Sequence, residues 1–126
     1  MSPPTHKEVF DAWIEYHSKE PSSQSLFWAW EYINETVSSD PESGWQLILG
    51  LIQQCPNNWV LCNIAAGPLE DLLIGNPERF IDRIETQVRR DPKFRLCLTG
   101  VWYEKEISEE ICQRIDKYTL TVEEPL

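Results

Sequence analysis

No lysine or arginine occurs between Lys19 and Arg79, although the same stretch contains eight aspartate and glutamate residues. The whole chain of 126 residues carries a formal net charge of −10. A surface with this charge repels the phosphates of nucleic acids and of anionic membranes, which argues against direct binding to either. The acidic N-terminal half suits a basic protein partner, and the simpler interpretation is a solvated, solubilising face.

Several motifs that carry chemistry are also missing. The five glycines form no GxGxxG or Walker pattern, so binding of a nucleotide phosphate has no support. The two histidines belong to no HExxH or Cys/His arrangement, and we expect His17 to be a partly buried structural residue. No CxxC pair occurs, so we expect reduced, largely buried thiols at Cys55, Cys62, Cys97 and Cys112. The sequence therefore predicts no cofactor, no metal and no recognisable nucleophile with its base.

A long apolar run is absent as well. No stretch approaches the roughly 20 apolar residues that cross a bilayer. The opening residues, Met1 to His6, lack the basic and then apolar regions of a secretory signal. We therefore expect a cytoplasmic protein that makes no membrane contact.

Helix starts, in contrast, are plentiful. Three pairs combine a capping side chain with a proline at the first helical position: Asp40-Pro41, Asn76-Pro77 and Asp91-Pro92. Thr5 and Glu8 have the spacing of a capping box, and Ser108 precedes two glutamates that favour a helix N-terminus. These signals predict an all-α fold.

Apolar residues recur with helical spacing between these starts. In the second expected helix, the core-facing stripe consists of Leu26, Trp30, Ile33 and Val37. Gly67-Pro68 should kink or interrupt a later helix. We expect one helical domain over residues 1–126. Its parts are an N-terminal helix within 1–20, a stack of helical hairpins over 21–118 and a tail over 119–126.

An internal repeat appears when the chain is shifted by 36 residues. Asp40-Pro41-Glu42 then falls on Asn76-Pro77-Glu78, and Val60-Leu61-Cys62 falls on Leu96-Cys97-Leu98. This period predicts antiparallel helical hairpins that stack on one another, as in a short HEAT-like solenoid. A helical bundle accounts for the same helices without a repeat.

Aromatic residues in the second helix mark a candidate binding surface. The chain contains six tryptophans. Trp28 and Tyr32 stand one turn apart beside Glu31 and Glu35, a composition that resembles an aromatic anchor with a charged rim. The alternative is that a second layer of helices covers the rings.

The best carboxylate candidates are Glu70 and Asp71, which follow Pro68 at an expected helix start. Adjacent helical residues point about 100° apart, so this pair alone cannot converge on a metal ion or a scissile bond. Three roles remain open: stabilising the helix start through its dipole, contacting a partner, or catalysis together with other acids.

A resemblance to a known family rests on three segments: the run Ala65-Ala66-Gly67-Pro68-Leu69-Glu70-Asp71-Leu72-Leu73, then Phe80-Ile81-Asp82-Arg83-Ile84-Glu85, and Arg90-Asp91-Pro92-Lys93-Phe94-Arg95. Over roughly residues 25–103 the chain resembles small bacterial proteins known only as a domain of unknown function, with AAGPLEDLL as the most specific element. The resemblance implies a bacterial helical protein and directs attention to Gly67, Pro68, Glu70, Asp71 and Trp102. It implies no activity, cofactor or catalytic residue.

Three functional hypotheses follow. The leading one is a stoichiometric inhibitor, such as a cytoplasmic immunity protein that neutralises a toxin, because a small acidic protein can occlude a basic cleft. Its contact residues would be Trp28, Glu31, Tyr32, Glu35, Glu70 and Asp71. The second is a helical adaptor or regulatory protein. The third, a metal-dependent enzyme, requires Glu70 or Asp71 to meet other acids, for example Glu31, Glu35 or Glu42, across the helical stack.

Overall fold

The computed structural model describes residues 2–18 and 23–126, and every regular element in them is helical. The elements are α1 (His6–Ser18), the 3₁₀ turn η1 (Gln24–Leu26), α2 (Phe27–Ser39), α3 (Pro41–Gln54), α4 (Asn58–Ile64), the π-helical turn η2 (Ala65–Leu69), α5 (Glu70–Gly75), α6 (Pro77–Arg90), α7 (Pro92–Leu98) and α8 (Glu109–Thr119). The all-α prediction is confirmed. Two boundaries named in the sequence analysis lie outside the described residues. They are residue 20, the expected limit of the N-terminal helix, and Lys19, the last cation before Arg79. No helix in the described ranges is long and apolar enough to span a bilayer.

Most of the predicted helix starts are confirmed by side-chain caps. Thr5 and Glu8 form the reciprocal capping box, with Glu8 N donating to Thr5 Oγ1 over 3.1 Å. Asp91 accepts hydrogen bonds from two amides of α7, and Ser108 accepts one from Ile111. The predicted cap at Asn76 is wrong: its side-chain amide instead donates to Leu72 O of α5, 3.2 Å away.

The break predicted at Gly67-Pro68 is present as a widened helical turn. Gly67 has φ −112° and ψ −105°, and the five residues of η2 join α4 to α5. Pro68 has no amide hydrogen and its ring displaces the preceding turn, so the wider turn is how the helix continues past it. This continuity determines the direction in which the side chains of Glu70 and Asp71 leave the helix.

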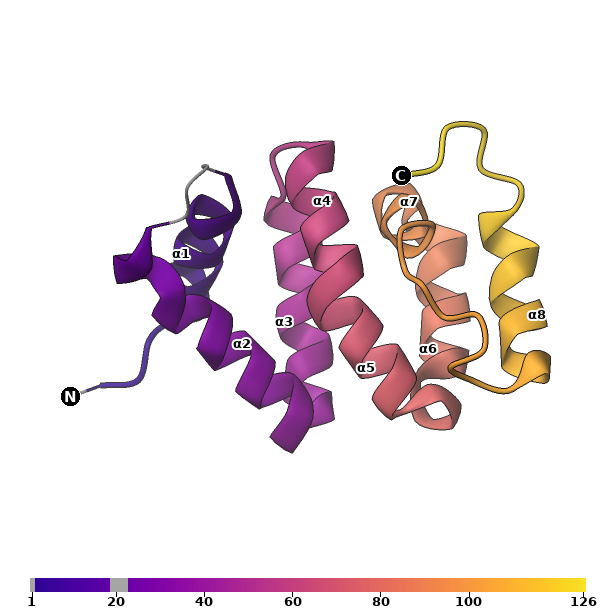
Figure 1. Cartoon of the computed structure of the whole chain (residues 1–126), viewed down its shortest axis with the longest axis horizontal. Helices are drawn as coiled ribbons and strands as arrows, with labels where there is room; N and C mark the ends of the chain where they lie inside the picture. Colours follow the sequence, from indigo (N-terminus) through magenta and orange to yellow (C-terminus); the bar gives the residue numbers. More distant parts are fainter. Residues whose placement is uncertain (1, 19–22) are drawn as a thin grey trace.

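The helices follow one another along the long axis of the molecule (Figure 1). α1 and α2 occupy one end, α3 to α5 the middle, and α6 to α8 the other end. The 36-residue repeat is visible in the element bounds, because α3 and α6 are both 14 residues long and begin at Pro41 and Pro77. The repeat that begins with α3 meets the repeat that begins with α6 where α7 packs on α3 and α4.

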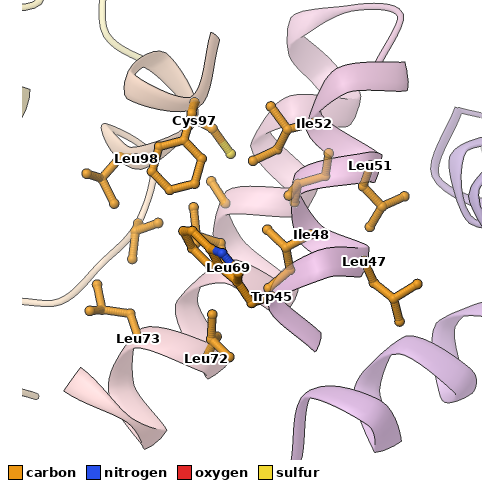
Figure 2. Close-up of a cluster of buried hydrophobic side chains, with 14 of the residues drawn as sticks. Trp45, Leu47, Ile48, Leu51, Ile52, Leu69, Leu72, Leu73, Cys97 and Leu98 are labelled. Atoms are coloured by element: carbon orange, nitrogen blue, oxygen red, sulfur yellow. The ribbon is translucent and has the colours of Figure 1, made fainter. Parts of the chain in front are cut away.

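The core is continuous and aromatic at its centre. Trp45 of α3 lies 5.7 Å from the ring of Phe80 and 5.6 Å from that of Phe94, measured between ring centroids. Leucines and isoleucines of α3 and α5 surround it, together with Cys97 and Leu98 (Figure 2). α3, α6 and α7 are therefore joined through one side chain.

The core-facing stripe of α2 differs from the prediction at one position. Its buried residues are Ala29, Ile33 and Val37, whereas the side chain of Trp30 is 39% exposed. A helix advances 100° per residue, so the arc centred on Ala29 and Ile33 leaves Trp30 at its edge. There the Trp30 ring stacks on Phe27, with 5.1 Å between centroids.

All four cysteines are free. Cys55 and Cys97 are buried, and Cys62 and Cys112 are half-buried, which confirms the prediction of unpaired thiols. The Cys97 thiol donates to Leu61 O across 3.6 Å, and burial raises its pKa.

A close approach between α2 and α3 depends on Gly44. A Cβ atom at Gly44 would lie 2.8 Å from the Cα of Val37, which is closer than real Cβ contacts come. We expect Gly44→Ala to lower the free energy of unfolding by about 1–2 kcal/mol, because overpacking outweighs the gain in helix propensity. Urea unfolding followed by circular dichroism measures the change.

Gly75→Ala is the matched control, since nothing lies within 4 Å of a Cβ atom built there. Its stability should stay the same or rise by up to about 1 kcal/mol. A stabilised Gly44→Ala variant would contradict the packing between α2 and α3.

Candidate protein-binding surface

The residues singled out on α2 share one face of the helix. Trp28, Glu31, Tyr32 and Glu35 stand at positions i, i+3, i+4 and i+7, which project side by side on an α-helix. This row, here called the α2 stripe, lies on the side of the helix largely opposite the buried row of Ala29, Ile33 and Val37. The backbone of α2 is therefore fixed by its core face while the stripe is presented at the surface.

The α2 stripe combines apolar and charged groups. Trp28 is 39% exposed, and Tyr32 is half-buried against the core. Glu31 and Glu35 are exposed, and within the described residues neither carboxylate takes part in a hydrogen bond or an ion pair. The stripe thus holds an aromatic pair beside two negative charges that nothing in the described chain neutralises.

Outside the α2 stripe, arginines that are distant in sequence neutralise part of the negative charge of the N-terminal half. Glu42 of α3 binds Arg79 and Arg83 of α6, with N–O distances of 2.9 and 2.5 Å. These guanidinium groups lower the pKa of Glu42, with the hydrogen bond from Arg83 as the main cause. The stretch before Arg79 contains no cation in sequence, but arginines of α6 neutralise part of its negative charge in the folded protein. The negative charge that stays unpaired among the described residues is therefore confined to fewer carboxylates.

Glu70 and Asp71 point toward different neighbours. The Glu70 carboxylate accepts a hydrogen bond from the backbone amide of Trp102, with 3.0 Å between N and Oε1. Asp71 instead lines a hollow of about 430 Å³ together with Asn34 and Ser38 of α2. Partial burial against these groups raises the pKa of Asp71. Asp71 thus borders α2, while Glu70 fixes the loop that follows α7.

The carboxylates do not converge in the way that metal-dependent chemistry would need. Glu42 faces α6, Glu70 faces Trp102 and Asp71 faces α2. Among residues 2–18 and 23–126, no group of three or more His, Cys, Asp or Glu side chains is placed to hold a metal ion.

Sequence reasoning missed a row of rings on the other flank of α2. Phe27 lies 5.9 Å from Tyr16 and stacks on Trp30. Nearby, Trp59 is 57% exposed and its indole nitrogen donates to His17 O over 2.8 Å. The aromatic cluster Phe27-Trp28-Ala29-Trp30 was the available sequence signal. Trp28 lies on one flank of α2 and Phe27 and Trp30 lie on the other, and this arrangement depends on how α1 packs.

His17 is half-buried, as predicted. Its ring lies 3.8 Å from that of Trp13, and Nδ1 is 2.9 Å from Trp13 O. Burial lowers the pKa of His17, which makes the neutral ring the favoured form near pH 7. These contacts assign it a packing role.

A family model matches the chain over residues 16–122. It describes a family of unknown function, DUF6869. No curated protein and no solved structure is significantly similar to the chain. The matched segment spans nearly all of the helical stack, from the end of α1 to the tail beyond α8. The chain therefore belongs to the DUF6869 family.

Proposed function

We propose that this protein binds a basic partner protein through the α2 stripe and acts as its stoichiometric inhibitor, in the manner of an immunity protein that neutralises a toxin in the bacterial cytoplasm. One observation carries the proposal: Glu31 and Glu35, which have no ion-pair partner among residues 2–18 and 23–126, lie beside the half-exposed ring of Trp28. Unpaired charge speeds encounter with a basic surface, and a tryptophan supplies apolar contact area.

The geometry supports different roles for the charged and the aromatic contact residues. Glu31 and Glu35 are exposed and act over a distance of about 8–10 Å at physiological salt. Trp28 and Tyr32 lie beside them and are partly held by the fold, so they lose little freedom on binding. Asp71 adds a charge next to α2, whereas Glu70 accepts a hydrogen bond from the Trp102 amide and holds the loop after α7.

The test begins with capture of the partner from the bacterium of origin, followed by association and dissociation kinetics with purified components. The double variant Glu31→Lys/Glu35→Lys should slow association on the order of tenfold at low salt and weaken its salt dependence. Trp28→Ala should mainly speed dissociation, with a loss of about 2 kcal/mol or more if the ring is a central anchor.

The matched control is Glu123→Lys/Glu124→Lys, which makes the same change in net charge in the exposed tail. It should leave the association rate near that of the wild type. If the tail variant slows association and the α2 variant does not, the partner meets the other end of the molecule and the proposal is wrong. Circular dichroism checks that each variant remains folded.

An adaptor role is supported by a different observation. Trp102 in the loop after α7 and Leu120 directly after α8 are 83% and 78% exposed. An inhibitor forms a 1:1 complex in which the partner's activity is lost, whereas an adaptor leaves that activity intact and recruits a third component. Sedimentation of the reconstituted complex, with an assay of the partner, separates the two roles. A toxin-like reading frame directly upstream would favour the inhibitor.

A further inference from the structure

A groove of about 660 Å³ lies between the loop after α7 and the tail after α8. This volume is in the range of pockets that enclose a ligand or a few side chains. In Figure 1 the loop runs from α7 to α8 and the tail returns from α8 toward α7, at the end of the molecule away from α2. The groove is therefore separate from the α2 stripe.

Both sides of the groove carry a large apolar side chain in solvent. Trp102 in the loop is 83% exposed, and Leu120 after α8 is 78% exposed. They are the two most exposed large apolar side chains of the described residues, and both line the same groove. Paired apolar groups at the mouth of a pocket are typical of a site that is covered by a partner.

The groove is formed in the unbound protein because hydrogen bonds hold its walls. Glu70 fixes the backbone of Trp102 from α5. Leu126 N donates to Thr99 Oγ1 over 2.9 Å, which ties the tail to the loop. Between these walls the hydroxyl of buried Tyr103 donates to the Asp116 carboxylate. A preformed site loses little conformational entropy on binding.

The charge around the groove is negative. Glu104 and Asp116 line it, against the single cation Lys105. Two further cations near its walls are already engaged: Arg95 donates to Tyr118 O and Thr121 Oγ1, and Arg114 is bound by Asp82 and Glu85 of α6. Repulsion argues against phosphates here, and it also argues against a second copy of this chain, whose net charge is −10. A cationic partner fits.

We propose that this groove binds a short arginine-containing segment of a partner protein, with an aliphatic side chain between Trp102 and Leu120 and the guanidinium group near Glu104 and Asp116. Arginine fits better than lysine, because its planar guanidinium group presents several N–H donors and can pair with two carboxylates at once. The segment would sit at the end of the stack opposite the α2 stripe, so the inference stands independently of the function proposed for that stripe.

The test titrates an end-capped pentapeptide of alternating arginine and leucine into the ¹⁵N-labelled full-length protein. We expect saturable shifts of amide signals from residues 99–108 and 119–126, with a Kd below about 1 mM. A peptide of alternating glutamate and leucine should cause no saturable shift, and one of alternating arginine and serine should bind about tenfold more weakly. Equal binding of the arginine–serine peptide would overturn the apolar part of the proposal.

Variants locate the site. Trp102→Ser and Leu120→Ser should each weaken binding of the arginine–leucine peptide about tenfold, and Glu104→Gln should reduce its salt dependence. Trp59→Ser, the same type of change at an exposed ring near α1, should bind as the wild type does. Both groove variants alter exposed side chains, and Leu120→Ser alone decides the question if Trp102→Ser does not fold. Wild-type affinity in a folded Leu120→Ser variant, shifts centred on α2, or no saturation at millimolar peptide would refute the site.

Discussion

Trp45→Ala should lower the free energy of unfolding by about 3–5 kcal/mol, which is a large part of the 5–15 kcal/mol that holds a typical domain together. The indole ring is only 5% exposed and contacts Phe80 and Phe94 at once. Its removal leaves a cavity where α3, α6 and α7 meet, and the two rings facing it lose their shared neighbour.

Urea unfolding followed by far-ultraviolet circular dichroism measures this loss, because that signal does not depend on tryptophan fluorescence. Trp102→Ala is the matched control: its ring is 83% exposed, and the change should stay within about 0.5 kcal/mol. Similar losses in both variants would mean that Trp45 does not occupy the centre of the core.

Cys97 in the native protein should react with a thiol reagent at least about a thousandfold more slowly than in the urea-unfolded chain. Its side chain is fully buried and its thiol donates to Leu61 O, so the reagent gains access only after the surrounding helices open. Burial also raises the pKa of Cys97, which lowers the fraction of reactive thiolate.

Mass mapping of labelled peptides distinguishes the four thiols within one experiment. Half-buried Cys62 serves as the internal reference and should be labelled before Cys97. Labelling of Cys97 at the rate of Cys62, or a disulfide in freshly purified protein, would contradict the placement of these cysteines.

Much of the fold could be predicted from the sequence because helix starts depend on local chemistry. The caps at Asp91 and Ser108 need only their own helices, and both were predicted correctly. Asn76 was missed because its amide group has a competing acceptor, Leu72 O, one turn earlier. Asparagine can donate as well as accept, and the choice depends on how the preceding helix ends.

The candidate surface was predictable only within one helix. Spacing placed Trp28, Glu31 and Glu35 in one row, since that follows from 3.6 residues per turn. The partners of Glu42 and Glu70 could not be foreseen, because Arg83 and Trp102 approach them only after α6 and the following loop have packed. Trp30 was misplaced because the core arc of α2 is centred on Ala29 and Ile33, a choice among apolar positions that the sequence pattern left open.

The order of the helices in the stack also has a consequence for how the chain can fold. α1 packs on α2, α3 and α4, and α8 packs on α6 and α7, so the described contacts of each terminal helix lie with elements close to it in sequence. Closing short loops costs less entropy than closing long ones, and chains with local contacts fold quickly. During synthesis, α1 to α3 can therefore assemble before the ribosome has added α6 to α8. Each later hairpin then docks on a surface that already exists.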